Sequence, residues 1–71
     1  MEIAIMKTDI STKRDFRTVK NRLKRVYKIK ECTIDLDDID KVVRVIGDRF
    51  KIGTVVNKIR SYGFLCEELS D

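Results

Sequence analysis

Thr12 and Asp15 are the residues whose types and spacing first suggest chemistry in this chain. They stand three positions apart, between an apolar run and a stretch with helical periodicity. Two thiols at that spacing would bind a soft metal ion, whereas a hydroxyl and a carboxylate form a helix cap. Residues 10–15 are therefore predicted to start a helix, with Thr12 accepting a hydrogen bond from the Asp15 amide and Asp15 reaching back.

Other reactive side chains are few. The chain has two cysteines, Cys32 and Cys66, and no histidine, which is the commonest transition-metal ligand and the commonest general base near neutral pH. Neither cysteine has the basic, helix-N-terminal setting that activates a thiol. We therefore expect no enzyme and no cofactor, with Cys32 buried as a small hydrophobe. Cys66 remains an alternative metal ligand, alone or in an intermolecular site.

Four aspartates lie close together in the chain, at residues 35, 37, 38 and 40. A calcium loop would also need alternating oxygen ligands, a glycine at its sharp bend and a distal bidentate glutamate, and these are missing. The acidic run therefore predicts a solvated, negatively charged turn.

The net charge of +4 is unevenly distributed. Residues 1–30 hold ten Lys or Arg and three acids, whereas residues 31–71 hold six and nine. A basic surface of this kind attracts anions and loses that attraction as salt rises. The candidate anion-binding residues are Lys13, Arg17, Lys20 and Lys24. The alternative is an ordinary solvated helix exterior.

Size and apolar content predict one domain, spanning residues 1–71. Hydrophobic residues make up 42% of the chain, which is enough for a small core. The longest apolar run, residues 3–6, is far below the roughly 20 residues that cross a bilayer. We expect no membrane association and a cytoplasmic location.

Periodicity predicts the elements that must position these side chains. Alternation favours strands at residues 2–7, 29–36, 41–47 and 64–69, with a hairpin turn between the second and third. A helical stripe follows Thr12, and a second helix ends at Gly63 as its C-cap glycine. The residues of the two stripes are Phe16, Val19, Leu23 and Val26, and then Ile52, Val55, Val56 and Ile59.

This order predicts an α+β fold, a ferredoxin-like βαββαβ sandwich. Its four-stranded antiparallel sheet should have the strand order 4-1-3-2, with both helices covering one face. Strands two and four are then opposite edges. Cys32 and Cys66 therefore lie too far apart for a disulfide, which needs Cα atoms within about 7 Å.

Three segments, residues 34–36, 41–48 and 55–64, resemble the heavy-metal-associated domain of metallochaperones and metal-transporting ATPases. The last of them looks like that family's helix ending in a glycine and an aromatic residue. The resemblance covers the whole domain and implies a relation to proteins of heavy-metal transport and detoxification.

The family's motif, Met-x-Cys-x-x-Cys, lies on the loop after strand one and binds Cu(I), Zn(II) or Hg(II). By this resemblance its methionine falls on Ile10 and its cysteines fall on Thr12 and Asp15. Phe64 resembles the family's aromatic residue near that loop and is expected to pack beneath the Ile10 loop. Thr and a single carboxylate are poor soft-metal ligands, so the loop is a degenerate metal loop and no metal is expected.

The remaining hypothesis is a non-catalytic binding or interaction module. Met6, Val42, Arg44 and Ile46, with Ala4, are expected on the open sheet face as a surface for a protein partner or a weak homodimer. RNA-recognition modules of this fold stack bases on aromatics of the two central strands, and these strands have none. Nucleic acid is therefore not expected, except through non-specific phosphate contacts of the first helix.

Overall fold

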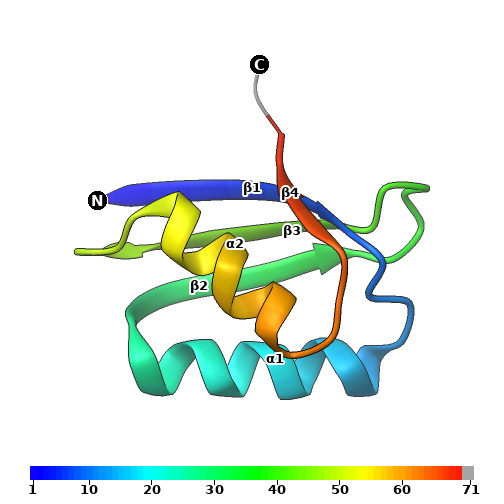
Figure 1. Cartoon of the computed structure of the whole chain (residues 1–71), viewed down its shortest axis with the longest axis horizontal. Coiled ribbons are helices and arrows are strands. Elements are labelled where there is room, and N and C mark those ends of the chain that lie inside the picture. The colour runs from blue at the N-terminus through cyan, green and yellow to red at the C-terminus, as the bar shows by residue number, and fades with distance from the viewer. Residues whose placement is uncertain (70–71) are drawn as a thin grey trace.

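The computed structural model describes residues 1–69 and has all four predicted strands and both predicted helices (Figure 1). The elements are β1 Glu2–Thr8, α1 Lys13–Val26, β2 Lys28–Asp35, β3 Val42–Asp48, α2 Ile52–Ser61 and β4 Cys66–Glu68. Among the described residues, no helix is both long and apolar enough to cross a membrane.

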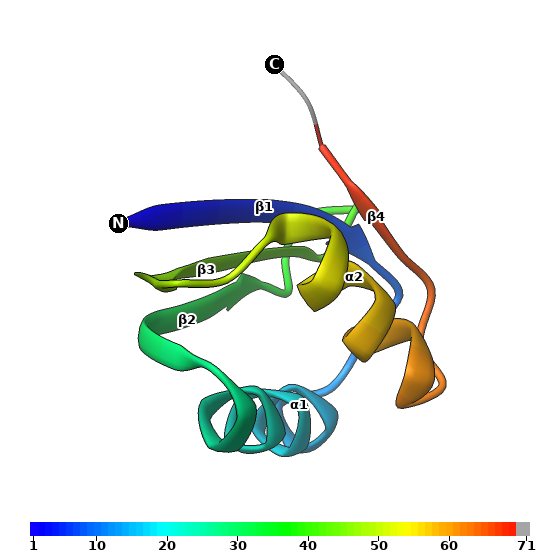
Figure 2. The same cartoon turned by 60° about the vertical axis from the view of Figure 1, so that its left-hand side comes forward.

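The sheet has the order β2-β3-β1-β4, and each neighbouring pair is antiparallel. Read from the other edge this is 4-1-3-2, so the predicted ferredoxin-like sandwich is confirmed. The two helices lie on the same side of the sheet, with α1 against β2 and α2 against β1 and β4 (Figures 1 and 2). Cys32 and Cys66 are free thiols on opposite edge strands.

The core forms between the helices and the inner face of the sheet. From α1, Val19 and Leu23 are fully buried, and Phe16 is half buried against them. Val26 was predicted to continue this stripe, but its side chain is 53% exposed. It is the last residue of α1, where the chain already turns toward β2.

The faces of β1 are the reverse of the prediction. Met6 and Ala4 were expected on the open face, and both are fully buried in the core. Ile3 and Ile5 face outward instead, since they pair with Ile46 and with an exposed Arg44. Both faces of this central strand are apolar, so the register with β3 decides which one faces the helices.

The ends of the helices follow from local chemistry. Thr12 is the N-cap of α1, and its hydroxyl oxygen accepts from the Asp15 amide at 3.1 Å, as predicted. Within residues 1–69 the Asp15 carboxylate accepts no hydrogen bond from the Thr12 amide, so only one of the two hydrogen bonds of the predicted capping box is present. Gly63 follows α2 at a φ of 97°, the left-handed conformation expected of a C-cap glycine.

Candidate functional site

The loop between β1 and α1 contains the residues predicted as a degenerate metal loop. Ile10 is fully buried in the core. Thr12 is exposed and occupied as a helix cap, and Asp15 is half buried on the first turn of α1. Among residues 1–69, no group of three His, Cys, Asp or Glu side chains could hold a metal ion.

A surface hollow of about 720 Å³ lies where this loop meets the segment between α2 and β4. The Asp9 carboxylate accepts from the Leu65 amide at 2.8 Å and so ties the two segments together. Phe64 lines the hollow and packs against the core, close to the loop that carries Ile10. Thr12 and Asp15 lie outside it. The lining residues are Lys7, Thr8, Asp9, Arg60, Phe64, Leu65, Cys66 and Glu67.

Four polar side chains that line this hollow, those of Lys7, Thr8, Asp9 and Arg60, have partners within the protein. Arg60 Nε donates to the Cys66 carbonyl at 2.8 Å, and the Lys7 ammonium lies 3.6 Å from the Asp40 carboxylate. Burial raises the pKa of the Cys66 thiol to about 11, with Arg60 opposing the rise. Because the thiolate is the form that binds metals, Cys66 in this setting is a weak ligand.

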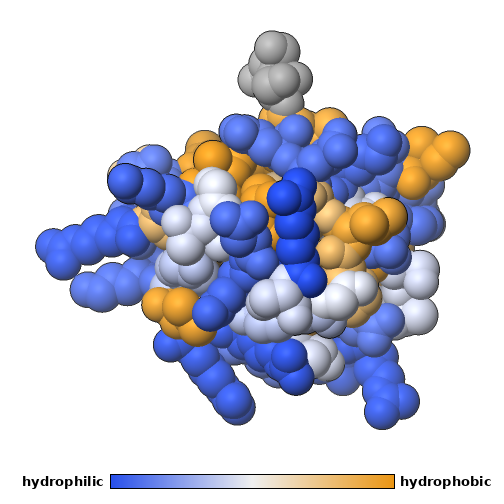
Figure 3. Space-filling view, viewed as in Figure 1, coloured by the Kyte–Doolittle hydropathy of each residue, from blue (hydrophilic) through white to orange (hydrophobic). Residues whose placement is uncertain are grey.

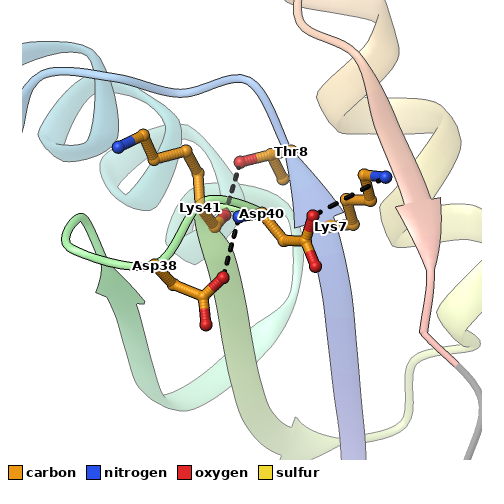
Figure 4. A network of polar contacts seen from close by, with 5 residues as sticks. All are labelled: Lys7, Thr8, Asp38, Asp40 and Lys41. Carbon is orange, nitrogen blue, oxygen red and sulfur yellow. Dashed lines mark hydrogen bonds and ion pairs between the residues drawn. The ribbon is translucent and has the colours of Figure 1, made fainter.

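Thr8 holds the end of β1 and is the polar residue that the sequence pattern did not single out. It is 6% exposed, and its hydroxyl donates to the Lys41 carbonyl at 2.7 Å while accepting from the Ile10 amide at 3.2 Å. Figure 4 shows the contact between the Thr8 hydroxyl and Lys41. The Thr8 amide donates to the Asp40 carbonyl at 3.0 Å. The only sequence signal is its place after Ala4 and Met6 on the inner face.

The acidic turn between β2 and β3 uses its carboxylates to fold itself. One Asp35 oxygen accepts from the amides of Asp37 and Asp38, and Asp38 accepts from the Asp40 amide at 2.7 Å. The Lys41 ammonium donates to the Leu36 carbonyl at 2.6 Å. These bonds are those of an Asx-type turn.

The basic residues of α1 form a strongly charged surface. Seven of its 14 residues are Lys or Arg and one is acidic. Among residues 1–69 none of these cations takes part in an ion pair; the ion pairs that form involve Met1, Lys7 and Lys30. Hydrophilic side chains project from the region of α1 at the bottom of the view in Figure 3.

The open sheet face carries part of the predicted interaction surface. Val42 and Ile46 are half buried there with an exposed Arg44 between them, while Met6 lies on the opposite face. Ile3, at 52% exposure, stands beside Ile46 and extends the apolar part. The structure therefore brings together three of the four predicted residues of this surface.

The hollow, the α1 cations and the open sheet face are three separate surfaces of one small domain. Comparison of the chain with protein-family models, curated proteins and solved structures gave no match.

Proposed function

We propose that this chain is a heavy-metal-associated-type domain whose metal loop has become structural, and that it acts as a non-catalytic interaction module. The observation that carries the proposal is the state of Thr12. Its hydroxyl caps α1, while Ile10 beside it fills the core. The scaffold of such a loop is kept, and the two positions that would need thiolates serve the helix instead.

A protein partner, or a second copy held weakly, is the proposed binding partner. What supports this is the apolar part of the open sheet face and the cations of α1, none of which forms an ion pair within residues 1–69. We also propose a cytoplasmic location, supported by two buried thiols that stand on opposite edges of the sheet.

A second candidate function is non-specific binding of nucleic acid by α1. The seven cations of α1 favour it, since each phosphate contact adds affinity that salt removes. The aromatic rings do not support base stacking: Tyr27 packs against Phe50, and Tyr62 lies beneath the Arg22 guanidinium. Binding of this kind would therefore show little sequence preference.

Native mass spectrometry with Cu(I) or Zn(II) under reducing conditions tests the main proposal. The wild-type chain should bind neither ion more tightly than about millimolar, because it lacks a set of soft ligands. The double variant Thr12→Cys with Asp15→Cys should gain binding at a stoichiometry of one, since it supplies two thiolates at the family spacing.

The matched control is Thr12→Ser with Asp15→Cys, which keeps a capping hydroxyl and supplies only one new thiol. It should stay as weak as the wild type. Tight binding by the wild-type chain would refute the proposal. If the double variant folds and remains metal-free, the loop has been aligned wrongly with the family motif.

A further inference from the structure

β2 is an exposed edge of the sheet. It runs for eight residues and pairs only with β3, whereas the opposite edge strand, β4, has three. An edge strand presents unpaired N–H and C=O groups to any extended chain beside it. The first half of β2 is protected by a register irregularity between Ile29 and Glu31 and by Lys28 and Lys30. Residues 32–35 pair regularly with β3 and contain no lysine. Their one charged side chain is Asp35 at the end of the strand, where its carboxylate accepts hydrogen bonds from the Asp37 and Asp38 amides of the turn.

One flank of α1 overlooks this edge. Lys13, Arg17, Lys20 and Lys24 recur at i, i+4, i+7 and i+11 and so share a face of the helix, which we call the lysine flank. Arg22 projects from the other flank, with its guanidinium carbon 5.0 Å from the centre of the Tyr62 ring at the end of α2. The lysine flank therefore faces away from α2 and toward β2.

The environment of Cys32 on β2 agrees with this placement. Burial raises the pKa of the Cys32 thiol to about 11, and the nearby charges of Lys20 and Lys24 oppose that rise. Two ammonium groups of the lysine flank thus lie close enough to β2 to act on its side chains.

Apolar side chains lie between the lysine flank and β2. Phe16 is half buried, and its neighbours three and four positions away on the helix surface are Lys13 and Lys20. Ile34 of β2 is half buried against the same core. A strand added beside residues 32–35 would therefore lie next to the apolar side chains of Phe16 and Ile34 and to the ammonium groups of the lysine flank.

We propose that an extended, acidic protein segment binds as an additional strand along residues 32–35 of β2, with its carboxylates toward the lysine flank. This inference rests on the proposed interaction function and names its surface and the chemistry of its partner. The main-chain hydrogen bonds of strand addition supply affinity, and side-chain pockets and charges supply specificity.

Charge excludes the other occupants of this surface. A second copy of the chain would bring its own α1 and its own Lys28 and Lys30 against the same cations, and like charges repel. A nucleic acid would satisfy the cations and leave the strand edge unused. The large apolar side chains exposed among residues 1–69 also include no aromatic ring on which a base could stack.

The test uses a blocked peptide of about nine residues that alternates Glu and Val, titrated into metal-free protein at low salt. Lys20→Glu with Lys24→Glu should weaken binding by about tenfold or more, through loss of two charge contacts. The matched control, Arg14→Glu with Arg25→Glu, makes the same change of net charge on the solvent side of α1. It should weaken binding by less than about threefold.

Backbone pairing is tested on the peptide, so that no protein variant has to fold. Two forms of the peptide carry N-methyl groups on alternate amides, one on the odd and one on the even positions. The form methylated at the amides that face β2 should lose binding, because each methyl group removes a donor. Amide NMR signals of residues 32–35 should shift with the unmethylated peptide. Equal binding of both methylated forms would overturn strand addition.

Three further results have defined meanings. Equal competition by a single-stranded oligothymidylate of the same charge would assign the surface to phosphate binding and overturn the proposal. Dimers that form without peptide and that added peptide dissociates would assign it to a second copy and overturn the proposal. Tight metal binding by the wild-type chain would refute the proposed function instead.

Discussion

Thr8 is the residue on which three segments of this fold converge. Its hydroxyl bridges the Lys41 carbonyl at the end of the acidic turn and the Ile10 amide at the start of the loop. Because the side chain is buried, both partners would lose their hydrogen bond without gaining water. The position of the Ile10 loop therefore depends on a polar contact as much as on the burial of Ile10.

Thr8→Val keeps the shape of this side chain and removes its hydroxyl. We expect it to lower the free energy of unfolding by about 1–3 kcal/mol, since it leaves the buried Ile10 amide and the partly buried Lys41 carbonyl without this partner. Urea unfolding followed by circular dichroism measures the change. Thr18→Val is the control, since the Thr18 hydroxyl is exposed on α1 and bonds only to the Arg14 carbonyl. If both variants lose equal stability, the buried hydrogen bonds of Thr8 stabilise the fold no more than an exposed hydroxyl does.

Residue types alone predicted some of these roles and missed others. Thr12 could be predicted as a cap because a hydroxyl before a helical stripe has few other uses. Thr8 could not, because a threonine at the end of a strand looks the same whether its hydroxyl meets water or a carbonyl. Met6 was assigned to the wrong face because Ile3 and Ile5 are as apolar as Ala4 and Met6.

At the scale of elements, the backbones of β3 and the start of β2 approach closely at Gly47. Gly47 pairs with Ile29, next to the register irregularity, and a Cβ at Gly47 would collide with the Lys28 carbonyl oxygen. That carbonyl belongs to the backbone and cannot move aside as a flexible side chain would. The glycine thus permits β2 to bend where it follows α1.

Gly47→Ala should therefore lower the free energy of unfolding by about 1–3 kcal/mol, the range for an overpacked interior. Gly53→Ala is a matched control in the first turn of α2, where a Cβ would meet no atom within 4 Å. It should raise stability by about 0.5–1 kcal/mol, because alanine favours the helix and restricts the unfolded chain. Chemical denaturation of both variants gives the comparison. A neutral Gly47→Ala would mean that β2 can shift at little cost.

Element types and their order were predictable because the period changes from two to 3.6 and back along the chain. A short chain with the element order β-α-β-β-α-β can form only a few sheet topologies, because the connections between parallel strands must be right-handed. Element ends were less predictable. Val26 continues the apolar stripe of α1 in sequence, yet it lies where the helix ends and no facing element covers it. The hollow beside Phe64 depends on the path of the α2–β4 segment, which periodicity does not specify.

At the scale of the whole molecule, charge is separated between α1 and the acidic turn. The helix carries seven cations and one acid, and the turn between β2 and β3 carries aspartates that bond within it. Repulsion among the α1 cations opposes folding at low salt, since they are closer together in the helix than in the unfolded chain. A surface that costs stability in this way is consistent with a binding role, in which an acidic partner would relieve the repulsion.

Arg14→Glu tests that cost. The new carboxylate would lie in the first turn of α1, near the positive end of the helix dipole and three positions before Arg17. We expect a gain of about 0.5–1 kcal/mol in the free energy of unfolding at low ionic strength, most of it lost at about 1 M salt as screening shortens the range of these interactions. Urea unfolding at the two salt concentrations measures both values.

Arg25→Glu makes the same change of net charge in the last turn of α1, where a carboxylate meets the negative end of the dipole. Its gain should be smaller than that of Arg14→Glu, or absent, because the dipole then opposes the relief of repulsion. Equal gains from the two variants would show that only the total charge matters. No gain from either at low salt would mean that the α1 cations do not strain the fold, and the argument that an acidic partner relieves them would then lose its energetic basis.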